Sequence, residues 1–204
     1  VQWGVETVIP YPPLDNCHPQ TPTLEGQNSV MPPPLREKRH QGILWNALRT
    51  GLVSTVATDN APFDFNSQKK RGRADFTKIP NGIPSVEDRI NLLYTYGVCR
   101  GRIDLPRFVD AASTQAARLF GLFPKKGTIQ VGSDADIVIF DPNYRGTISA
   151  KTQQMNVDYS AYEGVAIEGR PSVVTVRGKV QARDGKFVGQ QDRGAFLQRD
   201  PTHG

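Results

Sequence analysis

The sequence has little of what most metal sites and disulfide frameworks require. Among its 204 residues are two cysteines and three histidines. Two cysteines make no disulfide framework and indicate a reducing, cytoplasmic compartment. The histidines, His18, His40 and His203, fit no short metal-binding spacing such as HxH or HExxH. Cys17 lies beside His18, but adjacent side chains point apart in an extended chain, so this pair is a poor metal site.

Long apolar runs and several well-known motifs are also absent. No run approaches the ~18–20 residues that a membrane helix needs, so we expect no membrane partner. Residues 1–10 lack the basic start and the apolar core of a signal peptide. The sequence contains no GxSxG, P-loop or GxGxxG motif, which removes the usual support for a serine hydrolase or a nucleotide-binding protein.

Basic charge is confined to one region. The net charge is +5, and residues 35–73 hold eight Lys or Arg against three Asp or Glu, so the remainder of the chain is neutral. The block Lys69–Arg73 could contact nucleic acid or phosphate. Only Phe65 and Phe76 lie nearby and no nucleic-acid motif accompanies the block. We therefore interpret it as a solvated loop and expect no nucleic-acid partner.

The remaining composition is that of a globular chain. Hydrophobic residues make up 37% of the sequence and glycine adds 19 residues, which is ordinary for one or two folded domains. Eight of the 16 prolines fall in residues 10–34, so this stretch is predicted to be mostly extended loop because proline removes a backbone donor.

The first part of the chain alternates strands and helices, which is typical of an α/β parallel sheet or barrel. Gly51 and Gly121 suit the ends of helices, and Ser85 suits an N-cap with Asp88 three residues on. The predicted elements are a strand at Val5–Ile9, a helix at Leu35–Thr50, a strand at Leu52–Thr58, and helices that begin at Ser85, near Pro106 (through Ala112) and at Thr114 (to Phe120).

The second part is predicted to be all β. Gly127–Asp141 is predicted to form two short strands. Val173–Val188 is predicted to form a meander with turns at Arg177-Gly178 and Asp184-Gly185, because Asp-Gly between strands favours a hairpin. We place a domain boundary near residue 122, so that residues 1–122 form one unit and residues 123–204 a β lobe that ends in a polar tail of sixteen residues.

Two positions are candidates for chemistry on pattern alone. Asp59 directly follows the predicted strand that ends at Thr58, and in an (α/β) barrel a carboxylate there points into the active-site mouth. The alternative is an Asx turn that leads into Pro62. Asn81-Gly82 predicts a tight turn, which could also present groups to a small ligand. The pattern alone leaves both alternatives open.

Five longer segments carry a resemblance to a known family. They are 31–41 (MPPPLREKRHQ), 53–63 (VSTVATDNAPF), 75–89 (DFTKIPNGIPSVEDR), 119–142 (LFGLFPKKGTIQVGSDADIVIFDP) and 148–164 (ISAKTQQMNVDYSAYEG). In this order they resemble the hydantoinase/dihydropyrimidinase family of cyclic amidohydrolases, over nearly the whole chain. The string GSDADIVIFDP is shared more widely among amidohydrolases.

The resemblance implies a fold and an activity. The fold would be the C-terminal part of a TIM-like (β/α)8 barrel, with its strands seven and eight, followed by the C-terminal part of a β-sandwich lobe. Such enzymes hydrolyse the ring amide of hydantoins or dihydropyrimidines to N-carbamoyl amino acids. They use two zinc ions, which make hydroxide available at neutral pH. They usually assemble as tetramers or dimers.

The resemblance also assigns roles to residues. Asp59 matches an aspartate that ligates zinc, takes a proton from the attacking hydroxide and passes it to the leaving ring nitrogen. Asn81 matches a residue that hydrogen-bonds the cyclic imide. Pro32 stands where a serine backbone usually contacts substrate, so that it keeps the carbonyl and loses the N–H. Asn60-Ala61 replaces the usual His-Cys and changes the surroundings of the aspartate.

The match to the family is incomplete. Its HxH pair, carboxylated lysine and two single histidines have no counterparts here, and one aspartate cannot hold two zinc ions. We therefore expect a partial chain that is inactive and poorly soluble by itself. A non-catalytic dihydropyrimidinase-related scaffold protein and one half of a split enzyme are the alternatives. Asp59 favours the enzyme, because those scaffolds usually lack an acid there. Nothing in the sequence distinguishes hydantoin from dihydropyrimidine substrates.

Overall fold

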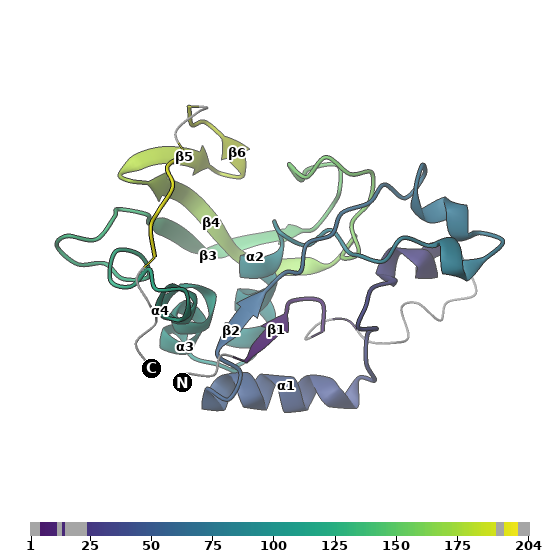
Figure 1. Ribbon diagram of the computed structural model, residues 1–204, viewed down its shortest axis with the longest axis horizontal. Coiled ribbons are helices and arrows are strands. Elements are labelled where there is room, and N and C mark those ends of the chain that lie inside the picture. The colour runs from purple at the N-terminus through teal and green to yellow at the C-terminus, as the bar shows by residue number, and fades with distance from the viewer. Residues whose placement is uncertain (1–4, 12–13, 15–23, 191–193, 200–204) are drawn as a thin grey trace.

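Two β-sheets and a set of short helices make up the fold. The computed structural model describes residues 5–11, 14, 24–190 and 194–199. In chain order the elements are β1 (Glu6–Val8), η1 (Leu24–Ser29), α1 (Arg39–Thr50), β2 (Thr55–Ala57), η2 (Lys69–Gly72), η3 (Phe76–Lys78), α2 (Arg89–Leu93), η4 (Tyr94–Val98), α3 (Leu105–Val109), η5 (Asp110–Thr114), α4 (Gln115–Leu119), β3 (Val138–Thr147), β4 (Ala166–Val176), β5 (Lys179–Arg183) and β6 (Lys186–Phe187). Figure 1 shows the sheet of β3–β6 above the helices and the β1–β2 pair near the centre.

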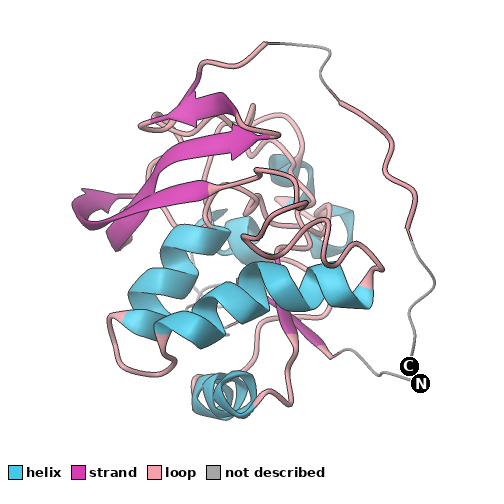
Figure 2. Ribbon diagram, turned by 90° about the vertical axis from the view of Figure 1, so that its left-hand side faces the viewer, coloured by secondary structure: helices cyan, strands magenta, loops and turns pink. Residues whose placement is uncertain are grey.

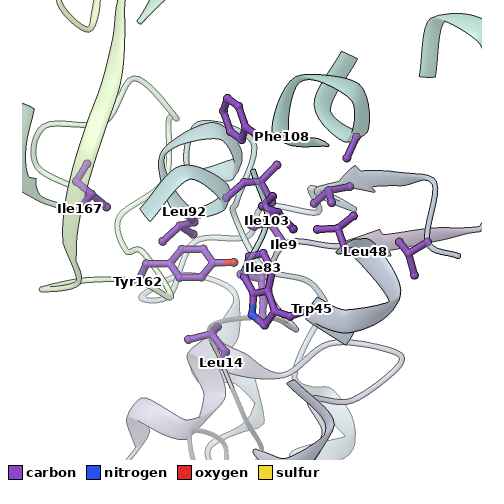
Figure 3. Close-up of a cluster of buried hydrophobic side chains, with 14 of the residues drawn as sticks. Ile9, Leu14, Trp45, Leu48, Ile83, Leu92, Ile103, Phe108, Tyr162 and Ile167 are labelled. Carbon is purple, nitrogen blue, oxygen red and sulfur yellow. The ribbon is translucent and has the colours of Figure 1, made fainter. Parts of the chain in front are cut away.

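The two strands predicted in the first part are present and pair in parallel. Glu6 lies opposite Thr55 and Val8 opposite Ala57. Both strands are three residues long, shorter than the predicted ranges at each end. The pair packs on the main core, in which Ile9, Trp45 and Leu48 are buried (Figure 3). The parallel sheet expected from the alternating pattern is therefore confirmed for these two strands.

Two arginines fix β2 to the helices. The guanidinium of Arg107 donates hydrogen bonds to the carbonyls of Leu48, Val53 and Ser54, the first at 2.6 Å. Arg89 donates to the carbonyl of Val56 at 2.9 Å and to that of Ala112. A charged donor on a carbonyl makes a stronger hydrogen bond than a neutral one, so these side chains hold a short strand that has few ladder bonds.

Helix α1 ends as predicted but begins later. Gly51 adopts φ 83° and its N–H bonds the carbonyl of Leu48, which is the left-handed C-terminal stop expected there. The helix starts at Arg39, so the predicted start at Leu35 is wrong by four residues. Three prolines directly precede Leu35, and they hold the chain extended up to that point.

The predicted N-cap at Ser85 is also wrong. Helix α2 starts at Arg89, and the side chain of Asp88 makes no capping hydrogen bond. Ser85 Oγ instead donates to the carbonyl of Thr58 at 3.0 Å. Ser85 is fully buried, and its hydroxyl joins two loops rather than starting a helix.

The two helices predicted after residue 105 form one run. Asp104 caps α3 by accepting the N–H of Arg107, and Pro106 lies in the first turn as expected. The run continues through the π-helical turn η5 into α4 without a break. Thr114 is therefore no cap, and its hydroxyl donates to the carbonyl of Gly127. Gly121, at φ 65°, follows the end of the run as predicted.

The second sheet confirms the predicted meander. Its strand order is β3-β4-β5-β6, all antiparallel. The turns fall at Arg177-Gly178 and Asp184-Gly185, and all four residues have positive φ, as two-residue hairpin turns require. Of the two strands predicted in 127–141, only the second forms, as β3, which starts at Val138 and continues to Thr147. The first is wrong, because residues 127–137 form no strand.

An aromatic contact joins the second sheet to the helices. The ring of Phe140 on β3 lies 4.6 Å from that of Tyr94 and 6.1 Å from that of Phe108. Gly169 on β4 passes beside these rings, where a Cβ would be 2.6 Å from the Phe140 ring. Figure 2 shows the larger sheet lying over the helices. The proposed boundary at residue 122 stays a prediction.

Several residues named in the sequence predictions lie near the termini. Cys17, His18, His203 and part of the predicted polar tail lie outside the described residues. Within the described ranges, no helix combines the length and the apolar character needed to span a membrane.

We predict that Gly169→Ala destabilises the fold more than Gly164→Ala. Both glycines have positive φ, at 73° and 81°, so each substitution carries a backbone cost of about 1–2 kcal/mol. Only Gly169→Ala also displaces the Phe140 and Tyr94 rings, which adds about 1–3 kcal/mol. A Cβ at Gly164 meets nothing within 4 Å. Thermal unfolding checks this, and equal Tm losses would contradict the role of the aromatic contact.

Candidate active site

The candidate site lies beyond the carboxyl ends of the two parallel strands. Because β1 and β2 run in parallel, the residues that follow them meet at the same edge. Tyr11 follows β1 and Asp59 follows β2. Burial raises the pKa of Tyr11, Arg36 lowers it and Asp59 raises it further, with a net upward shift. This electrostatic coupling places Tyr11, Arg36 and Asp59 in one neighbourhood.

Asp59 is held in an unusual backbone conformation. It has φ 47°, which Asp and Asn adopt more readily than other non-glycine residues. Its side chain is exposed, and within the described part of the chain no group donates a hydrogen bond to its carboxylate. A carboxylate with free lone pairs at the end of a strand is able to accept a proton or bind a cation.

Asn60 fixes the loop that carries Asp59. Its Oδ1 accepts the backbone N–H of Ser85 at 2.9 Å and that of Val86 at 3.1 Å. Asn60 also pairs with Ile83 in an isolated parallel bridge. The residue that departs from the family pattern thus has a structural role here, because it ties the loop after β2 to residues 83–86.

The segment that carries Asn81 is tied to the same place. The N–H of Gly82 donates to the carbonyl of Val30 at 3.0 Å. Gly82 has φ 150°, and a Cβ there would be 2.3 Å from the carbonyl oxygen of Ala61. Only glycine allows this close approach of three chain segments. Asn81 itself is exposed, and no described residue bonds its side chain.

Pro32 lies on the third segment. It is exposed, and its neighbour Pro33 accepts a hydrogen bond from Tyr11 Oη at 2.7 Å. Because Val30 pairs with Gly82, Pro32 lies two residues from the junction that also positions Asn81 and the Asp59 loop. The structure therefore brings together the loops of all three predicted site residues, Asp59, Asn81 and Pro32.

Lys69 is a functional candidate that the sequence interpretation missed. The solvated-loop prediction for residues 69–73 is wrong at this position, because Lys69 is 0% exposed. Lys70, Arg71 and Arg73 are exposed, as predicted. Lys69 Nζ donates to the carbonyls of Val30 at 3.1 Å and Gly82 at 2.7 Å. Burial lowers the pKa of Lys69 to about 8. Lys69 begins η2, a single 3-10 turn, and hydrophobic periodicity gives no signal for a buried residue in so short an element.

Three carboxylates hold segment 149–158 against the site loops. Asp88 Oδ1 accepts Gln153 Nε2 at 2.6 Å, and Glu87 accepts the N–H of Gln154 at 2.7 Å. Asp158 accepts the backbone N–H groups of Phe65 and Asn66, as well as the Asn66 amide. Burial would raise the pKa of Asp158, but these donors outweigh it and lower the pKa.

Asp88 is the most buried of these acids. It is 2% exposed, and its Oδ2 has no described hydrogen-bond partner. Burial and the nearby charge of Glu87 raise its pKa to about 7, against the lowering effect of Gln153. Asp88 also lines a groove of about 1000 Å³ between the start of α2, segment 147–155 and β4–β5. Asp59, Asn81 and Pro32 lie outside this groove.

Metal-binding groups are sparse. In residues 5–11, 14, 24–190 and 194–199, no three His, Cys, Asp or Glu side chains come together to hold a metal ion. His40 lies on α1, half-buried, and its Nδ1 is buried without a described partner. Asp59 therefore contributes a single potential ligand.

The chain is similar to amidohydrolases in sequence and in structure. A model of the amidohydrolase family matches residues 16–181. The D-hydantoinase of Geobacillus stearothermophilus is 52% identical over 197 residues, which cover 97% of this chain and 42% of that protein. The D-hydantoinase of Streptomyces coelicolor is 46% identical, over 95% of this chain and 41% of that protein. The solved structure of D-hydantoinase (dihydropyrimidinase) from Thermus sp. matches with a TM-score of 0.94 and 60% identity, over 98% of this chain and 43% of that one. The chain thus spans about two-fifths of the length of these relatives.

We predict that Asp88→Asn raises stability at neutral pH. The folded pKa, about 7, lies above the ordinary 3.8, so the unfolded chain loses its proton first and stability falls as pH rises from about 4 to 7. Asparagine has no such charge and still accepts the bond from Gln153. The Tm gain over the parent protein should grow between pH 4 and pH 8 in thermal unfolding.

Asp75→Asn is the matched control for this experiment. Hydrogen bonds from Thr77 lower the pKa of Asp75, whose side chain is 41% exposed. Its substitution should give no gain that grows with pH. A pH-independent Tm difference for Asp88→Asn would show that the buried carboxyl does not titrate as described.

Proposed function

The chain belongs to the amidohydrolase family, in its hydantoinase/dihydropyrimidinase branch, and on that premise we propose that it forms one side of a cyclic-amide hydrolase active site. Residues 1–122 would be the last part of a TIM-like barrel, with β1 and β2 as strands seven and eight. Residues 123–204 would be the C-terminal part of a β-sandwich lobe. The substrate would be a hydantoin or dihydropyrimidine and the product an N-carbamoyl amino acid.

The position of Asp59 is the observation that carries this proposal. The carboxylate is exposed just beyond the carboxyl end of β2, which is where barrel enzymes place catalytic groups. The loops of Asn81 and Pro32 converge on the same junction at Gly82. A non-catalytic scaffold protein has no need of an acid at this place, so Asp59 supports the enzyme.

Zinc is the metal that the family resemblance implies. Asp59 fits the role of one ligand, because its carboxylate is exposed and receives no hydrogen bond from a described residue. The described residues do not fit a complete centre of two ions, since they contain no group of three ligating side chains. We place the other ligands in parts of the complete enzyme outside this sequence, either on the same polypeptide or on the partner half of a split enzyme. This chain by itself would be inactive.

The residues of this chain would act on the substrate as follows. Asp59 accepts the proton of the attacking hydroxide while the oxygen adds to the ring carbonyl carbon. It then delivers this proton to the ring nitrogen as the C–N bond breaks, which leaves a carboxylate and an N–H. Asn81 offers an amide donor and acceptor to the cyclic imide, and the carbonyl of Pro32 accepts a ring N–H. The complete enzyme would be a homo-oligomer, a tetramer or a dimer.

We predict that Asp59→Asn in the complete enzyme lowers kcat for ring opening by about a hundredfold or more, because the proton acceptor is lost. The zinc content of the purified protein should fall as well. Asp75→Asn in the same loop region should leave turnover unchanged. Product formation from hydantoin and dihydrouracil measures the effect, and turnover above a few per cent of the parent value would contradict the role of Asp59.

Asn81→Ala should raise KM by about tenfold, as expected for one lost substrate hydrogen bond. Its kcat and zinc content should change little, because Asn81 contacts neither the metal nor the attacked carbon in this proposal. Asn46→Ala, on the exposed face of α1, is the control. Steady-state kinetics decide the matter, and an unchanged KM would remove Asn81 from the substrate contacts.

A further inference from the structure

Lys69 is a buried cation without a described counter-charge. Its side chain is 0% exposed, and it forms no ion pair with a described carboxylate. Burial of an unpaired ammonium is unfavourable, and the pKa of Lys69 falls to about 8 as a result. An apolar side chain of similar length would fill the same space without the free-energy cost of burying a charge. The ammonium group of Lys69 therefore has a role other than packing.

The hydrogen bonds of Lys69 form a bridge between two segments. Nζ donates to the carbonyl of Gly82 at 2.7 Å and to that of Val30 at 3.1 Å. The N–H of Gly82 donates to the same Val30 carbonyl at 3.0 Å. Nζ also lies 6.0 Å from the ring centroid of Phe63, near the limit of a favourable cation–π contact. Three hydrogen bonds thus lock residue 82 to residue 30.

Both bridged carbonyls are next to predicted substrate contacts. Gly82 directly follows Asn81, and Val30 precedes Pro32 by two residues. The side chain of Asn81 has no described partner, so its position depends on the backbone that carries it. The predicted contact of Pro32 with substrate is made by its backbone carbonyl, so the direction of this carbonyl depends on the backbone conformation around residue 32.

The backbone of Lys69 is fixed by contacts of η2 and the loop before it. Its N–H bonds the carbonyl of Asp64 at 2.9 Å. Asp158 binds the N–H groups of residues 65 and 66 at 2.5 and 3.0 Å. Gly72, at the end of η2, packs so closely on Ile79 that a Cβ would be 2.0 Å from Cγ1. The lysine therefore projects from a fixed support, which is what a group that positions other residues requires.

We propose that Lys69 is a positioning residue that sets the relative placement of Asn81 and the Pro32 carbonyl, and so the binding of the cyclic imide. This inference rests on the proposed function. Lys69 touches neither substrate nor metal in this account. Its removal should weaken substrate binding and leave the proton transfer by Asp59 nearly intact.

The test compares Lys69→Met with Lys70→Met in the complete zinc-loaded enzyme. Methionine keeps the length of the side chain and loses every donor. Lys70, next in the chain, is exposed and bonds Asn66 and the face of Phe65. We expect Lys69→Met to raise KM for hydantoin by about tenfold, with kcat and zinc content close to those of the parent. Lys70→Met should keep the parental KM.

Lys69→Gln keeps an amide NH2 group as a donor on a shorter, uncharged side chain and should give an intermediate KM. This variant also serves if Lys69→Met is not recovered as folded protein. A graded rise in KM from Lys through Gln to Met supports positioning. A parental KM in the variants, whatever their Tm, would overturn it, because Lys69 would then only stabilise the fold.

Hydrogen–deuterium exchange gives a readout that does not depend on activity. Lys69→Met should increase exchange in two peptides, one that carries the amides of residues 30–31 and one that carries those of residues 81–83, whereas Lys70→Met should not. If the parent enzyme opens no cyclic amide, the proposed function fails, and the exchange result still tests the bridge. Unchanged exchange in both peptides would overturn the positioning role in either case.

Discussion

The close approach of three chain segments at Gly82 is the constraint on which the candidate site depends. Residue 82 bonds Val30 through its N–H, accepts a hydrogen bond from Lys69, and lies against Ala61 where no side chain fits. Each of these segments carries or adjoins one predicted site residue. If the segments separated, Asp59, Asn81 and Pro32 would have no fixed geometry, because their own side chains have no described partners to hold them.

The scaffold around this junction relies on charged side chains that bond backbone carbonyls. A parallel pair of three-residue strands has few ladder bonds of its own. Arg107 and Arg89 supply donors to the carbonyls of and around β2, and Lys69 does the same for the loops beyond it. The carboxylates of Glu87 and Asp88 accept hydrogen bonds from residues 153 and 154, and Asp158 accepts the N–H groups of residues 65 and 66. Of the eight Lys and Arg side chains between residues 35 and 73, only Lys69 is buried, and the other seven are exposed.

Local sequence signals predicted the parts of the fold that local physics determines. Positive φ occurs at the hairpin turns Arg177-Gly178 and Asp184-Gly185 and at the helix end Gly51. Glycine at these positions predicted the turns and the helix end from neighbouring residues alone. The signals failed where a tertiary partner decides. Ser85 has a good N-cap sequence but bonds Thr58 in a distant loop, and Lys69 has the sequence context of a surface lysine. Asp59 was placed correctly at the strand end, but only the family resemblance gave it a role, since an Asx turn fitted the pattern as well.

A crystal structure of the complete enzyme with zinc and a bound hydantoin would test the central claim most directly. We expect anomalous zinc density about 2.0–2.2 Å from a carboxylate oxygen of Asp59, with the cyclic imide within hydrogen-bond distance of Asn81 and of the Pro32 carbonyl. Zinc and ligand located elsewhere, for example in the groove beside Asp88, would contradict it.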